Sequence, residues 1–247
     1  MKKLKLLRLQ FENEIEEYEI PAFRAAIAKK VGKENILFHY HLDDKTNLHR
    51  YPLIQYKRIN KHPSVICLEE GADEVNRFLT NKNWSISIGN KNIELKILKL
   101  DLNQFNLQVW DKNFTYKINN WIALNNDNYS NFLNTSSLAD RVSFLEKTLI
   151  AHIISFAEGV KWNIDKQINL VINEIHKQRW VKYKGVGFIG FDISFTTNVF
   201  LPDYIGLGKA VSVGFGVVKK IKKGNSSSAE ISEEIEENKR QPSPVNN

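Results

Sequence analysis

Cysteine is almost absent from this chain of 247 residues, in which Cys67 is the single one. One cysteine excludes a disulfide within the chain and a metal site built from several thiolates. Cys67 lies in an apolar run, so we expect it to be a small buried hydrophobic side chain. Long apolar runs are missing too, since no stretch reaches the roughly 18 residues that indicate a membrane-spanning helix. The N-terminal residues alternate leucine with charged side chains, which predicts a strand rather than a signal peptide, and the cytoplasm is the expected location.

Glycine is scarce as well, with 12 in the chain, yet four of them fall between Gly206 and Gly216. The segment reads Gly-Leu-Gly-Lys-Ala-Val-Ser-Val-Gly-Phe-Gly. Glycine backbone can take positive φ and lie flush against a bulky partner, and bare N–H groups beside a lysine suit phosphate oxygens. A hairpin whose bends need positive φ is the alternative, and spacing alone does not decide between them. The segment is neither a Walker A loop nor a dinucleotide-binding fingerprint, because neither order of glycines is present.

The charge of the chain is unevenly distributed. The net charge is +7, but the residues from Asn225 onward hold five glutamates against Lys239 and Arg240. The residues before this tail therefore carry a surplus of ten positive charges, which favours a polyanionic partner through phosphate neutralisation. A composition rich in lysine and asparagine gives a similar surplus without such a partner, so charge alone leaves nucleic-acid binding open.

Hydrophobic periodicity in the first half predicts a β-α-β-β-α-β order. Strands are expected at 5–12, 36–41, 51–59 and 64–68, with a hairpin of 84–88 and 93–100 around Gly89. Helices are expected from Pro21 to Gly32 and over 69–79. This is the order of a ferredoxin-like unit, which we assign to residues 1–103.

The second half, residues 104–223, is predicted to be a second ferredoxin-like unit with rearranged or lengthened strands. Its strands are expected at 106–110, 115–123, 169–176, 180–184, 188–195 and 211–219, with a polar stretch over 125–134. Ser137 and Asp140 form a capping box for a long helix whose apolar stripe runs from Leu138 to Val160. His152 lies beside this stripe and is predicted to be a packed histidine. Residues 224–247 are expected to be a disordered acidic tail.

Four of the six histidines, His39, His41, His49 and His62, lie within 24 residues. A solvated loop with incidental histidines is one interpretation. A zinc site of His39, His41 and His49 is a second, although the spacing of known zinc motifs is missing. Acid–base catalysis is the third, because histidine titrates near neutrality and a nearby lysine such as Lys45 can stabilise charge on a phosphate. RNA scission by the neighbouring 2′-hydroxyl needs this set and no metal, because its nucleophile is already tethered.

The glycine-rich segment resembles the C-terminal glycine-rich loop of the RAMP superfamily of CRISPR-associated proteins. That signature is Gly-hydrophobic-Gly, five residues with a basic one, and Gly-hydrophobic-Gly. Gly206, Gly208, Gly214 and Gly216 fit it, as do the hydrophobic Leu207 and Phe215 and the basic Lys209. The preceding residues 200–205 and the following strand Val217-Val218 look like the same superfamily.

Together with the histidine segment and the two-unit order, the loop makes residues 1–222 similar to the CRISPR-associated endoribonuclease that cuts precursor guide RNA within its repeats. In that family the catalytic histidine commonly lies after the first helix and ahead of a strand like Arg50-Tyr51-Pro52-Leu53-Ile54-Gln55-Tyr56-Lys57. His41 is the best match to it, His39 the second, and Lys45 matches the helper lysine loosely. The resemblance implies 5′-hydroxyl and 2′,3′-cyclic phosphate ends, with no metal or other cofactor.

The expected fold is thus α+β: tandem ferredoxin-like (RRM-like) units that frame a basic groove with the C-terminal glycine-rich loop. The expected partner is CRISPR repeat RNA in the precursor transcript, with other CRISPR-associated proteins as further candidates and no membrane. Candidate RNA-binding residues are Gly206, Gly208, Lys209, Gly214, Gly216, Arg50, Lys57, Lys219 and Lys220. A non-catalytic RNA-binding subunit of a CRISPR interference complex is the alternative.

Overall fold

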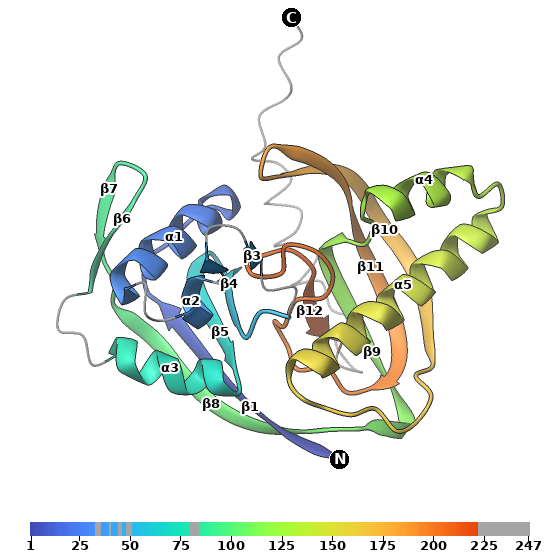
Figure 1. Ribbon diagram of the computed structural model, residues 1–247, viewed down its shortest axis with the longest axis horizontal. Helices are drawn as coiled ribbons and strands as arrows, with labels where there is room; N and C mark the ends of the chain where they lie inside the picture. Colours follow the sequence, from blue (N-terminus) through green and yellow to red (C-terminus); the bar gives the residue numbers. More distant parts are fainter. Residues whose placement is uncertain (33–35, 40, 44–45, 48–50, 80–83, 222–247) are drawn as a thin grey trace, which may run out of the picture.

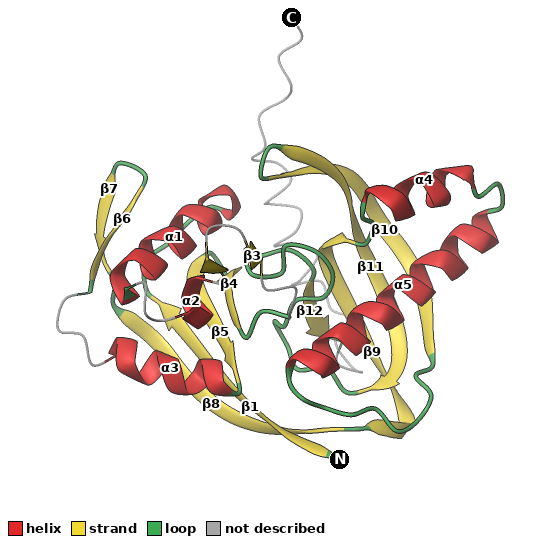
Figure 2. Cartoon of the chain, viewed as in Figure 1, coloured by secondary structure: helices red, strands yellow, loops and turns green. Residues whose placement is uncertain are grey.

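The computed structural model describes residues 1–32, 36–39, 41–43, 46–47, 51–79 and 84–221. Two four-stranded sheets lie side by side, and helices cover one face of each (Figure 1). All neighbouring strands in both sheets are antiparallel, and Figure 2 shows helices gathered on one face of each yellow sheet. The predicted α+β fold of tandem ferredoxin-like units is therefore confirmed.

The first unit follows the ferredoxin-like order, with a hairpin added before its last strand. Its sheet has the order β4-β5-β1-β8, so that the first strand lies between the third and the fourth, as the fold requires. The hairpin is β6–β7. The elements are β1 (Lys2–Phe11), the 3-10 turn η1 (Glu17–Glu19), α1 (Ile20–Val31), α2 (Ile36–His39), β2 (His41–Asp43), β3 (Thr46–Asn47), β4 (Ile54–Ile59), β5 (His62–Leu68), α3 (Glu70–Leu79), β6 (Ser85–Ile88), β7 (Lys91–Glu94) and β8 (Ile97–Leu107).

The second unit repeats this strand order, β10-β11-β9-β12, with one replacement. Between its third and fourth strands a ferredoxin-like unit has a helix, but here residues 200–216 form a loop that contains the four glycines. The elements are β9 (Val109–Ile122), α4 (Asn126–Asn134), α5 (Leu138–Gly159), β10 (Leu170–Tyr183), β11 (Val186–Val199) and β12 (Val217–Lys220).

The two units share part of their hydrophobic core. On the helix-covered face of β1, Leu7, Leu9 and Phe11 pack with α1 in one apolar cluster. On the other face, Leu4 and Leu6 belong to a second cluster, which continues through β9, α5 and β11 of the second unit. Each buried leucine contributes about 1.5–3 kcal/mol. The seam between the units is therefore held by the same burial that holds each unit.

Helix α5 begins where the sequence predicts. The Ser137 hydroxyl accepts a hydrogen bond from the Asp140 N–H at 3.4 Å, and Leu145, Leu149 and Ile153 are buried. Leu138 departs from the predicted stripe, because it lies in the first turn and 74% of it is exposed. None of the helices in the described ranges is both long and apolar enough to cross a membrane.

Several element predictions are wrong in instructive ways. Residues 36–41 are not one strand: Ile36–His39 is a helical turn and β2 begins at His41, because a short apolar run fits either structure. The polar stretch 125–134, for which neither helix nor strand is predicted, contains α4, which Asn125 caps by accepting from the Asn128 N–H at 2.7 Å. The strands predicted at 169–176 and 180–184 are one strand, β10, and that predicted at 211–219 is confined to β12. The predicted acidic tail lies outside the described residues.

Candidate functional site

Residues 206–216, hereafter the glycine loop, lie between the two sheets and are bound to the first unit through β4 (Figure 1). The Tyr51 hydroxyl donates to the Gly206 carbonyl at 2.7 Å, and the Gly206 N–H donates to the Gln55 side-chain oxygen at 2.9 Å. Further along the loop, two donors of β4 reach its carbonyls: the Tyr56 N–H reaches Ser212 at 3.0 Å and Lys57 Nζ reaches Val211 at 2.7 Å. The loop is therefore fixed against the strand rather than forming a simple hairpin bend.

Three of the loop glycines have backbone that disfavours any side chain. Gly208 has a φ of 92°, Gly214 a φ of 94° and Gly216 a φ of 61°. A Cβ at Gly208 would lie 2.8 Å from both the Ile122 carbonyl oxygen and Trp121 Nε1, and a Cβ at Gly214 would lie 2.7 Å from the Ile20 side chain. A Cβ at Gly216 would collide with the Leu207 carbonyl oxygen. Positive φ costs other residues about 1–2 kcal/mol even without such collisions, so glycine is required at all three positions.

Gly208 and Gly214 also present N–H groups that suit an anion. The N–H groups of Gly206 and Gly216 are used inside the protein, by Gln55 and by the Asn120 carbonyl at 3.1 Å. Those of Gly208 and Gly214 make no hydrogen bond within the described part of the chain, and both residues are half-buried. Backbone N–H groups at such turns can receive phosphate oxygens.

A cleft of about 520 Å³ opens between the units beside the Gly214 end of the loop. Four cationic residues line it, Arg58, Arg179, Lys182 and Lys219, whereas Glu17 is the one acidic residue among its lining residues. The rings of Tyr18, Tyr204 and Phe215 line it as well. Cations beside aromatic rings are what a nucleic acid with unpaired bases needs. We call this space the inter-unit cleft.

The arginines of the inter-unit cleft are held in place by hydrogen bonds. Arg179 Nε donates to the Asn120 side chain at 2.9 Å, and Arg179 Nη1 donates to Asp192 at 2.6 Å. Asp192 also accepts from the Asn120 N–H at 2.6 Å, which closes the network. Arg58 Nε donates to the Ile15 carbonyl at 2.6 Å. A phosphate would meet guanidinium groups that are already ordered, which lowers the entropy lost on binding.

The predicted lysines divide into surface and interior groups. Lys209 and Lys220 are exposed, with Nζ 4.5 Å above the Phe188 ring and 5.0 Å above the Phe114 ring, and Lys219 lines the inter-unit cleft. Lys57 is 0% exposed, and its burial lowers the pKa of the ammonium to about 7. Lys57 therefore has no surface to offer to an RNA, because β4 is covered on both faces.

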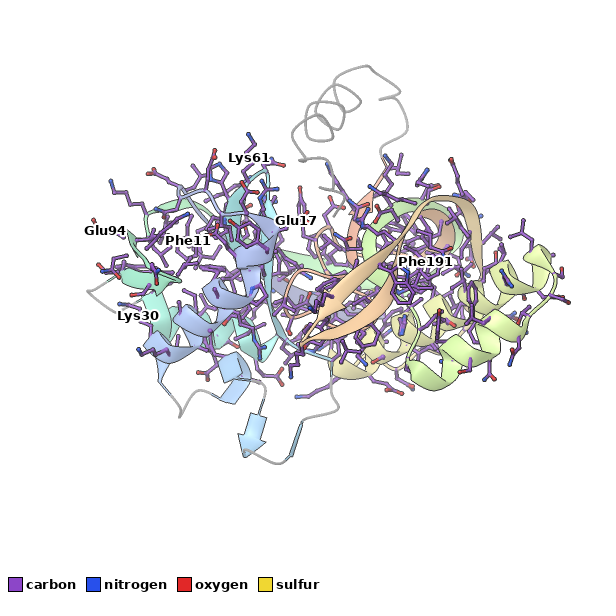
Figure 3. All side chains as sticks on the ribbon, turned by 90° about the horizontal axis from the view of Figure 1, so that it is seen from above. Phe11, Glu17, Lys30, Lys61, Glu94 and Phe191 are labelled. Carbon is purple, nitrogen blue, oxygen red and sulfur yellow. The ribbon has the colours of Figure 1, made fainter. Side chains whose placement is uncertain are left out.

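The structure separates the two candidate histidines instead of placing them on one strand face. His39 is the last residue of α2, and His41 is the first residue of β2, paired with Asn47 of β3. Figure 3 shows the β2–β3 hairpin standing away from the body on the opposite side to Glu17, which lines the inter-unit cleft. Lys45, His49 and Arg50 lie outside the described residues. Among the side chains that are described, no three metal-binding groups gather.

His152 is a packed histidine, as predicted. Its Nδ1 accepts a hydrogen bond from Trp121 Nε1 at 3.1 Å, and the two rings meet edge to face at 5.8 Å. Burial lowers the pKa of the imidazole to about 4, so the ring is neutral near neutral pH. A neutral ring that accepts from a buried indole stabilises the core and is removed from the cleft.

Sequence reasoning missed Arg58, Arg179 and Lys182, the cations that line the inter-unit cleft with Lys219. Lys182 lies in the strand predicted at 180–184, whereas Arg179 falls in the gap before it, and the network of Arg179 depends on Asn120, 59 residues away. Two register shifts in β10 before Arg179 break the alternation, so no local pattern marks Arg179 as a cleft residue. For Arg58 no signal existed either, because both faces of β4 are covered.

Both halves of this fold match known domains. Residues 2–106 match the Cas6b N-terminal domain and residues 108–221 match the Cas6b C-terminal domain. The chain belongs to the Cas6b family. The glycine loop and every residue that lines the inter-unit cleft lie within the ranges matched to Cas6b.

Solved structures of Cas6b are similar to this chain, and a curated relative is similar to part of it. A crystal structure of Cas6b is similar with a TM-score of 0.82 at 27% identity, covering 89% of this chain and 100% of that one. A second, of the CRISPR RNA processing endoribonuclease Cas6b, has a TM-score of 0.68 at 26% identity over the same shares, 89% and 100%. An uncharacterized protein of Methanocaldococcus jannaschii is 35% identical over 104 residues, which are 42% of this chain and 69% of that protein.

Proposed function

We propose that this Cas6b protein is a metal-independent endoribonuclease that cuts CRISPR repeat RNA in the precursor transcript to release guide RNAs. Membership of the family supports this, as does the similarity to a structure named as a CRISPR RNA processing endoribonuclease. One observation carries the proposal: the glycine loop presents two N–H groups, and its Gly214 end lines a cleft together with four cationic residues. This is an arrangement for an RNA backbone rather than for a small molecule.

The RNA would be held by its phosphates and read by contacts to unpaired bases. The N–H groups of Gly208 and Gly214 would receive phosphate oxygens at the loop, with Lys209 beside them. In the inter-unit cleft, Arg179 and Lys219 would neutralise further phosphates, while unpaired bases stack on the exposed rings. Figure 3 shows the β2–β3 hairpin on the opposite side to Glu17, which lines the inter-unit cleft, so the RNA would cross the glycine loop between the hairpin and the cleft.

The reaction would use the RNA's own nucleophile. The 2′-oxygen bonds to the adjacent phosphorus as the bond from phosphorus to the 5′-oxygen breaks. A general base takes the 2′-hydroxyl proton, and a general acid returns a proton to the departing 5′-oxygen. We assign the acid–base role to His41, with His39 as second candidate, and the stabilisation of charge on the phosphorane to Lys45. The products would be a 2′,3′-cyclic phosphate and a 5′-hydroxyl.

The test is incubation of the protein with the repeat RNA encoded beside its gene, in the presence of EDTA. The wild type should cut the RNA and give cyclic phosphate ends, whereas His41→Ala should cut about 10²- to 10⁴-fold more slowly. His176→Ala is the matched control: this histidine lies on β10, its Nδ1 is 3.2 Å from Glu174, and it does not line the inter-unit cleft.

Three results would contradict parts of this proposal. Full-length RNA that is bound but never cut would show the non-catalytic RNA-binding subunit instead. Cutting that stops in EDTA would refute metal independence. Cutting by the His39→Ala, His41→Ala double variant at the wild-type rate would place the chemistry elsewhere.

A further inference from the structure

We propose that Lys57 is a positioning residue of the glycine loop, and that its buried ammonium strengthens the binding of an RNA phosphate on the loop above it. The inference rests on the proposed RNA-binding function of the loop. It assigns to Lys57 a role without RNA contact, since the side chain is 0% exposed. It is also the one fully buried ionisable amine among the described residues.

The side chain of Lys57 is tightly packed between the backbone of β4 and the glycine loop. Its Nζ donates to the Val211 carbonyl at 2.7 Å. A Cβ built on Gly206 would lie 2.8 Å from this Nζ and 2.6 Å from Val211 Cβ. Gly206 and Val211, which are five residues apart in the chain, therefore both pack against the Lys57 amine. Movement of the amine would displace the first half of the loop.

Among the residues that the structure describes, no carboxylate forms a hydrogen bond or an ion pair with this amine. Across the sheet, its neighbours in the same row are Ser64 of β5 and Gln10 of β1, both buried and uncharged, and then Lys99 of β8. In the adjacent row, beyond Gln55, Arg8 of β1 is paired with Asp101 of β8. On the loop side, the ammonium of Lys209 lies over the Phe188 ring.

Burial alone therefore lowers the pKa of Lys57, to about 7. In the free protein the amine would be charged below this pH and neutral above it. An RNA phosphate on the loop is a nearby negative charge, which favours the charged form and raises the pKa of the bound state. RNA binding would then take up a proton, and protonation of Lys57 would in turn strengthen RNA binding.

The sign of the pH effect follows from this linkage. The additional RNA affinity that the charged ammonium provides is fully present below the pKa of Lys57 in the free protein, about 7. It is lost as the pH rises toward the higher pKa of the complex. Each pKa unit gained on binding corresponds to about tenfold in affinity. A rise of one unit would therefore weaken RNA binding about tenfold between slightly acidic and clearly alkaline pH.

The experiment measures the dissociation constant of repeat RNA with 2′-fluoro ribose, which cannot be cut, from about pH 6 to about pH 9. Lys57→Met and Lys57→Gln both remove the charge, and glutamine keeps a polar group one atom short of Nζ. Lys61→Met is the matched control, because it removes an exposed lysine of the same β4–β5 hairpin. The wild type and Lys61→Met should lose about tenfold in affinity with rising pH, whereas both Lys57 variants should lose much less.

The inference is overturned if RNA affinity depends on pH equally in the wild type and in the two Lys57 variants. This holds even if the variants bind RNA less tightly, because weaker binding alone also fits a lysine with a purely structural role. Should both variants fail to fold, calorimetry on the wild type at about pH 7.5 in buffers of different ionisation enthalpy decides. Uptake of about half a proton or more on RNA binding supports the inference, and no uptake refutes it. A wild type that binds no repeat RNA would refute the proposed function instead.

Discussion

Gly208→Ala should destabilise the protein and weaken RNA binding, whereas alanine at a glycine of similar conformation elsewhere should do little. At Gly208 the φ of 92° is one cost, about 1–2 kcal/mol for a residue with a Cβ. The collision is a second cost, because the new Cβ would lie 2.8 Å from a backbone carbonyl oxygen of β9, which cannot move freely. Overpacking of this kind costs about 1–3 kcal/mol.

Gly89→Ala is the matched control for conformation without collision. Gly89 lies in the β6–β7 turn with a φ of 57°, and no atom would lie within 4 Å of its Cβ. This hairpin is at the far edge of the first unit, away from the glycine loop (Figure 1). The control should cost about 1 kcal/mol, which lowers the melting temperature of a chain of this size by about 2–4 °C. Gly208→Ala should lower it by roughly 5–15 °C.

The assay combines thermal unfolding with binding of the 2′-fluoro repeat RNA below the melting temperature. Gly208→Ala should bind at least about tenfold more weakly than the wild type, because displacement of the loop costs more than about 1.4 kcal/mol of binding free energy. The control should bind like the wild type. If Gly208→Ala melts with the control and binds RNA normally, then the close approach to Ile122 is not a constraint and the loop does not hold the RNA.

Three further predictions concern the cleft, the packed histidine and the tail. Arg179→Gln should weaken RNA binding and reduce the slope of log affinity against log salt concentration by about one. Lys166→Gln is the control and should bind RNA like the wild type, because the Lys166 side chain is 57% exposed and its Nζ lies 3.6 Å from Asp111, outside the cleft. Equal slopes for the two variants would refute RNA binding in the inter-unit cleft. Burial lowers the pKa of His152, so the unfolded state takes up a proton before the folded state, and stability should fall as the pH drops from about 6.5 toward about 4. In thermal unfolding, His152→Gln should flatten this fall. An unchanged pH profile would refute the role of His152 as a buried neutral histidine. Deletion of residues 225–247 should leave cleavage intact and slightly tighten RNA binding in the same assays, because net negative charge is removed; loss of folding would show the tail to be part of the domain.

The fold could be predicted wherever one face of an element is buried and the other is not. Helix α5 shows this, since its apolar stripe and its Ser137 cap are both visible in the sequence. Strand β4 shows the limit, because both of its faces are covered and alternation cannot tell Lys57 from Arg58. Lys57 was therefore predicted to bind RNA, whereas Arg58 is the one that lines the inter-unit cleft.

The candidate site could be predicted only as far as its parts are local in sequence. The glycine loop is eleven consecutive residues, and its spacing alone carries the resemblance to a family. The cationic cleft is assembled from residues of both units, and its lining depends on strand register that no local pattern encodes. The assignment of His41 came from the resemblance, and it stays a prediction.

The loop that replaces a helix in the second unit would let the two units act on RNA together. A helix satisfies most of its own backbone groups, whereas a loop must find partners elsewhere. Here the partners are a carbonyl of β9 for the Lys209 N–H, and Gln55 and Tyr51 of the first unit for the two polar groups of Gly206. The loop is consequently bound to both units, and its two remaining glycine N–H groups are positioned by both. Substitutions beneath the loop in β4 should therefore change RNA affinity without any contact to RNA, as Gln55→Leu would test by binding and melting measured together.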